Sequence, residues 1–193
     1  PSPHLPAMQQ LLLADTISVL EELAPRCLAE EWDNVGLQIG DPRRPVHSLW
    51  VALDASPEVV AAACRSQVDL LITHHPFFFR PLRRIETDTP LGAAVAQAVR
   101  HDLAVYSLHT NLDAAAGGLN DWLGRRLGLL RMRPLTAPRG VARPRRCGIG
   151  RVGALQKAMP LADLARQAKR RLGASAVRVA GDPQLHVKRV ALT

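Results

Sequence analysis

The stretch Asp69-Leu70-Leu71-Ile72-Thr73-His74-His75-Pro76 decides how the fold is interpreted. Its run of large apolar residues predicts a short strand that is covered on both faces. Pro76 has no backbone N–H and favours extended backbone before it, so we expect the strand to stop there. The two histidines then lie at the C-terminal end of the strand, where open α/β sheets bind ligands. One packed and one solvated histidine is an equal alternative on this stretch alone.

Helices and strands alternate around this stretch. Residues 48–54 predict a buried strand, and Ser56-Pro57-Glu58 is typical of a helix start because Ser caps, Pro fits the first turn and Glu suits the positive helix end. That helix leads into the histidine-bearing strand, and such a unit with short connections has parallel strands. The remaining elements of this half are strands at 36–40 and 103–108 and helices at 89–99 and 119–128. The sequence therefore predicts an α/β fold.

The composition divides the chain into two lobes. Residues 8–130 predict an N-terminal α/β lobe that carries the candidate ligands, and residues 131–146 form an Arg/Pro-rich segment that we interpret as a linker. Residues 147–193 predict the start of a second α/β lobe, with a Gly-punctuated strand at 148–153, an amphipathic helix at 161–172 and strands at 177–181 and 187–192. The chain stops inside an apolar strand, so we expect the second lobe to continue beyond Thr193.

The bulk properties predict a globular cytoplasmic protein. The 193 residues are 47% hydrophobic and 22% charged, which is ordinary for a packed domain. The 3 cysteines are widely spaced, which suits a reducing compartment. No apolar run in the sequence reaches the length of a transmembrane helix, so we expect no membrane contact. The net charge of +8 suggests nucleic-acid binding, but the arginines are concentrated between Arg125 and Arg151 without interleaved aromatic residues. We therefore favour a solvated linker over a nucleic-acid surface.

A second predicted strand also ends in polar residues, His109-Thr110-Asn111-Leu112-Asp113. Because parallel strands end at the same edge of a sheet, three imidazoles and one carboxylate can converge there. Such donors suit Zn, Fe(II), Mn or Ni, and adjacent histidines can serve two ions roughly 3.5–4 Å apart. The alternative is that His109 bonds a carbonyl and Asp113 caps the turn before Gly117.

Several neighbouring residues have simpler interpretations. Trp32 is expected to anchor the core, and Asp33 and Asn34 are expected to cap a turn. The cluster Phe77-Phe78-Phe79 has three open interpretations: a hydrophobic wall beside the histidines, a subunit contact, or core packing.

The motifs Thr73-His74-His75-Pro76 and His109 to Asp113 resemble those of the NGG-interacting-factor-three-like family. Its members are also known as GTP cyclohydrolase I type-two homologues and dinuclear metal-centre hexamer proteins. E-x-W-D-N-V-G-L-Q-x-G at residues 30–40, Leu53-Asp54 and G-I-G-R-V-G at 148–153 also match, so the resemblance covers nearly the whole chain.

The resemblance implies a ligand set and an activity. His74 and His75 match ligands of two different ions, Asp113 matches an aspartate ligand, and His109 matches a ligand or a residue that supports one. The family implies two divalent ions per complete chain, two α/β lobes and a toroidal homohexamer. It also implies a metal-dependent hydrolase acting on a nucleotide or similar small molecule, or alternatively a non-catalytic ring scaffold that binds other proteins.

The resemblance also implies that part of the metal site is absent from this sequence. In the family, a further histidine and glutamate in a G-H-x-x-x-E stretch follow the position of Thr193. These 193 residues therefore carry half of the implied ligand set.

Overall fold

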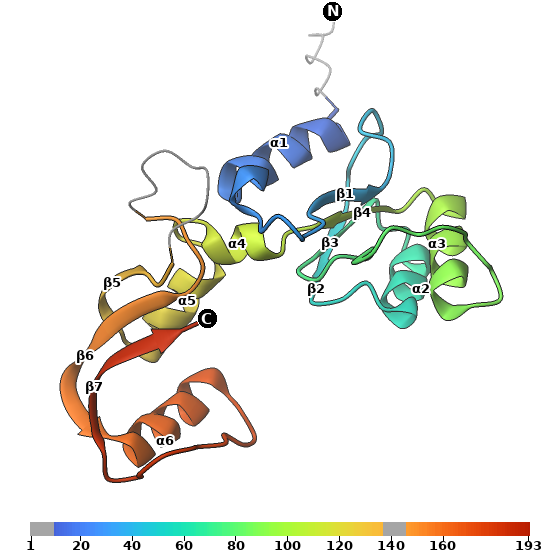
Figure 1. Ribbon diagram of the computed structural model, residues 1–193. Coiled ribbons are helices and arrows are strands. Elements are labelled where there is room, and N and C mark those ends of the chain that lie inside the picture. Colours follow the sequence, from blue (N-terminus) through green and yellow to red (C-terminus); the bar gives the residue numbers. More distant parts are fainter. Residues whose placement is uncertain (1–9, 137–145) are drawn as a thin grey trace, which may run out of the picture. The chain divides into compact units, whose positions relative to one another are not determined.

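The computed structural model describes residues 10–136 and 146–193 (Figure 1). It divides into two compact units. The first holds Glu30–His109 with the residues up to Glu22, and the second holds Leu23–Ala29 and Thr110–Thr193. The division falls before the boundary at residue 130 that the sequence predicted. The residues before 130 group with the second unit because α5 (Leu119–Leu127) packs against α6 (Leu161–Leu172) and β6 (Arg151–Pro160). β5 (Leu130–Pro134), which overlaps the start of the expected linker, pairs with β6 and belongs to the same sheet.

The first unit is an α/β sheet of four strands in the order β1-β4-β3-β2. These strands are β1 (Gly36–Ile39), β2 (Leu49–Ala52), β3 (Leu70–Thr73) and β4 (Ala104–Ser107). β2, β3 and β4 are parallel, and β1 pairs antiparallel with β4. The predicted strand–helix–strand units are thus confirmed, with α2 (Pro57–Arg65) and α3 (Pro90–Arg100) as the crossovers. The first unit also contains most of α1 (Leu13–Leu23).

The helix starts follow the capping residues in the sequence. The Ser56 hydroxyl accepts a hydrogen bond from the Val59 N–H at 3.3 Å, and the Thr89 hydroxyl accepts from the Gly92 N–H at 3.1 Å. α2 and α3 lie side by side, and their apolar faces share one buried core with β3 and β4 (Figure 1). Packing in this core holds β3 and β4 in parallel, so their C-terminal ends lie at the same edge of the sheet.

Two predictions about burial in this unit are wrong. β2 is the edge strand of the sheet, and Leu49, Trp50 and Val51 are 48%, 40% and 75% exposed rather than buried. Trp32 is 58% exposed and does not anchor the core. An apolar run indicates that a segment can form a strand. How much of that strand is covered depends on the order of the strands in the sheet, which the local sequence pattern does not predict.

The second unit is built on an antiparallel sheet in the order β5-β6-β7, where β7 is His186–Leu192. Its helical elements are η1 (Arg26–Leu28), α4 (Thr110–Ala114), α5 (Leu119–Leu127) and α6 (Leu161–Leu172). The predicted helix at 161–172 and strand at 187–192 are confirmed. The predicted strand at 177–181 is wrong: these residues are exposed and pair with no strand of the described chain. Among the described residues, no helix has the length and apolar character needed to cross a bilayer.

Candidate metal centre

The end of β3 is held to the ends of both β2 and β4 beyond the last residue of each strand. The His75 N–H donates to the Leu53 carbonyl at 2.9 Å, and the Leu108 N–H donates to the Thr73 carbonyl at 2.9 Å. The hydroxyl oxygens of Thr73 and Ser107, both buried, lie 3.0 Å apart. The sheet pairing therefore continues past the strands and delivers the histidines to one edge.

His74, His75 and His109 form one cluster at that edge. Their ring centroids are 5.2, 5.2 and 5.6 Å apart, and one ligand nitrogen from each lies within 4.8 Å of the others. The expectation that the two strand ends bring three imidazoles together is confirmed. His74 is half-buried and His75 is exposed, so the two histidines differ in solvation as the alternative expected, yet both rings belong to the same cluster.

Each of the three rings has an oxygen atom behind its Nδ1. The partner of His74 is the Leu108 carbonyl at 2.9 Å, that of His75 is Asp54 Oδ1 at 2.6 Å, and that of His109 is Asp33 Oδ1 at 2.9 Å. A carbonyl or an ionised carboxylate only accepts, so each Nδ1 donates its proton. The lone pair of each ring is then on Nε2, which is the arrangement of a metal-binding histidine supported by an oxygen acceptor.

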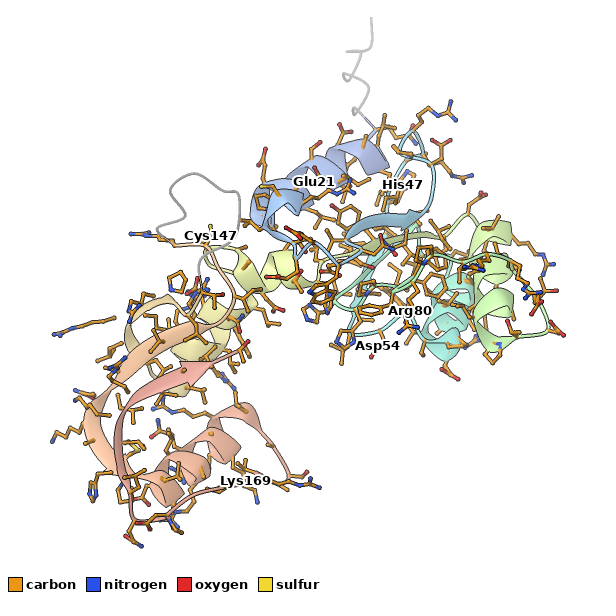
Figure 2. All side chains as sticks on the ribbon, in the orientation of Figure 1. Glu21, His47, Asp54, Arg80, Cys147 and Lys169 are labelled. Atoms are coloured by element: carbon orange, nitrogen blue, oxygen red, sulfur yellow. The ribbon has the colours of Figure 1, made fainter. Side chains whose placement is uncertain are left out.

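The sequence interpretation did not pair these two carboxylates with the histidines. Asp33 was expected to cap a turn, and it does accept from the Asn34 N–H at 2.8 Å, but the same oxygen also accepts from His109. Its side chain is fully buried. Asp54, labelled in Figure 2, follows β2 as the histidines follow β3 and β4. A polar residue at the C-terminal end of a predicted parallel strand was the signal available in the sequence.

Asp113 is not a member of the three-histidine cluster. It lies on α4 in the second unit, and its backbone carbonyl accepts from Asn120 Nδ2 at 3.2 Å. The Gly117 N–H after this helix donates to Asp121 Oδ2 at 2.7 Å. The assignment of Asp113 as a ligand therefore stays a prediction.

Aromatic side chains lie beside the cluster. The Trp32 ring meets the His109 ring edge-on with centroids 6.1 Å apart and lies 5.9 Å from the Phe79 ring. The Phe78 backbone is held by Gln38 and Asn34: its N–H donates to Gln38 Oε1 at 3.2 Å, and its carbonyl accepts from Asn34 Nδ2. The Phe79 contact supports the interpretation as a wall beside the histidines, whereas Phe77 packs against the buried core of α2 and α3, as the core-packing interpretation expected.

A model of the Duf34/NIF3 (NGG1p interacting factor 3) family matches residues 11–193. The chain belongs to this family. A relative from Clostridium perfringens, named GTP cyclohydrolase 1 type 2 homolog, is 36% identical over 185 residues, which cover 93% of this chain and 68% of the relative. A relative of the same name from Streptomyces coelicolor is 37% identical over 183 residues, covering 94% of this chain and 64% of the relative. The chain thus spans about two thirds of the length of these two NIF3-family relatives.

Solved structures show the same fold. The Staphylococcus aureus hypothetical protein SA1388 aligns with a TM-score of 0.86 and 26% identity, covering 95% of this chain and 71% of that protein. Reduced HcgD from Methanocaldococcus jannaschii aligns with a TM-score of 0.72 and 32% identity, covering 85% of this chain and 61% of that protein. The NIF3 fold therefore extends over both units of this chain.

Proposed function

We propose that this chain binds divalent metal ions at His74, His75 and His109, and that the complete protein is a metal-dependent hydrolase of a nucleotide or similar small molecule. The observation that carries the proposal is the convergence of three imidazoles, each with its Nδ1 held by an oxygen acceptor. The name shared by the relatives, GTP cyclohydrolase 1 type 2 homolog, supports a hydrolytic reaction on a nucleotide.

The donor set suits borderline divalent ions. Imidazole binds Zn, Fe(II), Mn and Ni, and the described part of the chain places no thiolate in the cluster. We propose two ions per complete chain, with Asp113 as a further ligand and with a histidine and glutamate beyond these 193 residues, as the family resemblance implies. Bound ions would supply an acidic water and a Lewis acid at this edge of the sheet.

The residues around the cluster have their own roles in this proposal. Asp33 and Asp54 fix the orientation and tautomer of His109 and His75. Trp32 and Phe79 give the cluster an apolar side, which strengthens electrostatic interactions at the adjacent histidines by displacing water.

Metal analysis tests the proposal. After loading with Zn or Mn and gel filtration, wild-type protein should retain divalent metal, measured by inductively coupled plasma mass spectrometry. The double variant His75→Ala with His109→Ala should retain little, because two of the three donors are lost. His101→Ala, an exposed histidine at the end of α3, is the matched control and should retain as much as wild type. A metal-free wild type, or equal metal in the double variant, contradicts the proposal.

A hydrolysis screen separates the enzyme from its alternative, a non-catalytic metal-binding ring scaffold that binds other proteins. GTP, other nucleotides and phosphoesters would be incubated with Zn- or Mn-loaded protein. Product formation that disappears in the double histidine variant supports the hydrolase, whereas retained metal without turnover of any of these compounds favours the scaffold. Nucleic-acid binding through the arginine segment is the third option. Residues 137–145 of that segment lie outside the described residues, and residues 131–134 are part of β5.

A further inference from the structure

A pocket of about 440 Å³ lies between the N-terminal ends of α2 and α3 in the first unit. Its volume is in the range of small-molecule binding sites, roughly 300–1,000 Å³. Its walls include Phe77, Leu91 and three prolines, Pro57, Pro76 and Pro90. Prolines and an aromatic ring at these positions give a rigid, mainly apolar surface.

The pocket adjoins the histidine cluster through two residues. Asp54 lines the pocket and also accepts the hydrogen bond from His75 Nδ1 at 2.6 Å. Pro76, another lining residue, directly follows His75 in the chain. A molecule in the pocket therefore lies close to His75, on the side of the ring where Nδ1 meets Asp54, and its remaining part must reach past this ring to approach the proposed metal ions.

The charge around the pocket disfavours anions. Among the described residues that line it, Asp54 is the one ionisable group, and no lysine or arginine is present. The carboxylate of Glu58 accepts a hydrogen bond from the lining residue Ser56, and this bond lowers the pKa of Glu58, so the carboxylate stays charged. Two carboxylates and no cation make this a poor site for a phosphate group.

The helix ends do not reverse this preference. A helix N-terminus attracts anions through its unpaired N–H groups. Here Pro57 and Pro90 have no N–H to offer, and the N–H groups of Val59 and Gly92 are already bonded to the capping hydroxyls. The Ser56 hydroxyl, which is the other polar side-chain group of the lining, donates to Glu58 at 2.7 Å. Few donors are left to hold an anion.

We propose that this pocket takes the uncharged base of a nucleoside-type substrate and that any phosphate groups of the substrate stay outside it. This inference rests on the proposed function and specifies which end of the substrate faces the apolar walls. Contact through ring faces with Phe77 and the prolines, with few side-chain hydrogen-bond donors, predicts weak discrimination among bases.

Saturation-transfer NMR tests the inference. It would measure binding of four ribonucleosides, guanosine, adenosine, cytidine and uridine, to the protein with and without EDTA. Leu91 is 38% exposed on the first turn of α3, so Leu91→Trp should fill the pocket without disturbing the core. Val99→Trp, on the last turn of the same helix and 60% exposed, is the control. We expect nucleoside binding by wild type and Val99→Trp, at least tenfold weaker binding by Leu91→Trp, and no competition from inorganic triphosphate.

Several results would overturn the inference: no binding of any of the four nucleosides, equal binding by Leu91→Trp, or displacement by inorganic triphosphate. Leu91→Glu provides a second variant whose added charge should also weaken binding, and thermal unfolding checks that both variants are folded. The outcome is separable from that of the proposed function. Nucleoside binding by a protein that retains no metal after loading and gel filtration supports the pocket and contradicts the proposed function. Retained metal without nucleoside binding contradicts the pocket and leaves the proposed metal binding supported.

Discussion

The three histidines owe their orientation to the oxygen atoms behind their rings. An imidazole with a donating Nδ1 presents its lone pair at Nε2, so the acceptor decides which nitrogen can bind a metal. Asp54 and Asp33 perform this task for His75 and His109, and the Leu108 carbonyl performs it for His74. The two carboxylates act through the histidines, so they are positioning residues.

We therefore expect Asp54→Ala to weaken metal binding by about 10- to 100-fold, the usual effect of removing such a support. The Asp54 side chain is 57% exposed, so the fold should be unaffected. Zn affinity, measured by competition with a chromophoric chelator, checks this. Asp54→Asn should recover most of the affinity because its amide oxygen still accepts from Nδ1. Asp88→Ala, at an exposed position, is the control. Wild-type affinity in Asp54→Ala would refute the positioning role.

At the scale of elements, Arg151 joins β6 to the segment around α5. Its side chain is buried, and it donates to both oxygens of Asp121 and to the carbonyls of Ala115, Gly148 and Gly150. The hydrogen bond from this guanidinium lowers the pKa of Asp121 below its ordinary value of 3.8, although burial acts in the opposite direction. A buried charge of this kind is tolerated because its partners are all in place.

Asp121→Asn should destabilise the protein by about 3 kcal/mol at neutral pH, because it leaves the Arg151 charge buried without a carboxylate. Since the folded-state pKa of Asp121 is depressed, its contribution is complete above about pH 3.8 and is lost as the pH falls through the lower folded value. Urea unfolding of wild type and variant should converge in that acid range.

The exposed pair Asp163–Arg166 on α6 is the matched control for this pair. Asp163→Asn should change stability by at most about 1 kcal/mol, as is usual for surface ion pairs. If the two asparagine variants lose the same stability at neutral pH, the buried pair is not the stabilising contact described above.

At the scale of the molecule, the β2 edge of the first sheet carries apolar residues, and no strand of residues 10–136 or 146–193 pairs with its outer side. β2 has a neighbour on one side, and Val51 and Leu53, within and just after the strand, are 75% and 61% exposed. An open edge with apolar side chains is a template for another strand. We propose that this edge takes part in self-association, in line with the homohexamer that the family resemblance implies.

Val51→Lys should therefore shift the protein toward smaller species, because a charged side chain on an edge strand opposes pairing. Sedimentation velocity at several concentrations measures the distribution. Val99→Lys places the same charge at a 60% exposed position on α3 and should leave the distribution unchanged. A monomeric wild type, or equal distributions for wild type and Val51→Lys, would count against this role of the edge.

The sequence by itself determined the parts that depend on short-range chemistry. The apolar run at residues 70–73 became a buried strand, and Ser56 and Thr89 cap the two crossover helices as their side chains predict. The sequence also offered the convergence of His74, His75 and His109 as one of two interpretations, because parallel strands end at the same edge of a sheet, but that β3 and β4 are neighbours was decided by the tertiary structure.

Only the tertiary structure decided what surrounds these residues. The oxygen partners of His74, His75 and His109 lie 34, 21 and 76 residues away in the chain, so no local pattern pairs them. The exposure of β2 and the division between the units after His109 likewise depend on strand order and on which segments pack together. Sequence periodicity records which residues prefer burial, whereas the contacts that satisfy that preference are made by residues brought together from distant parts of the chain.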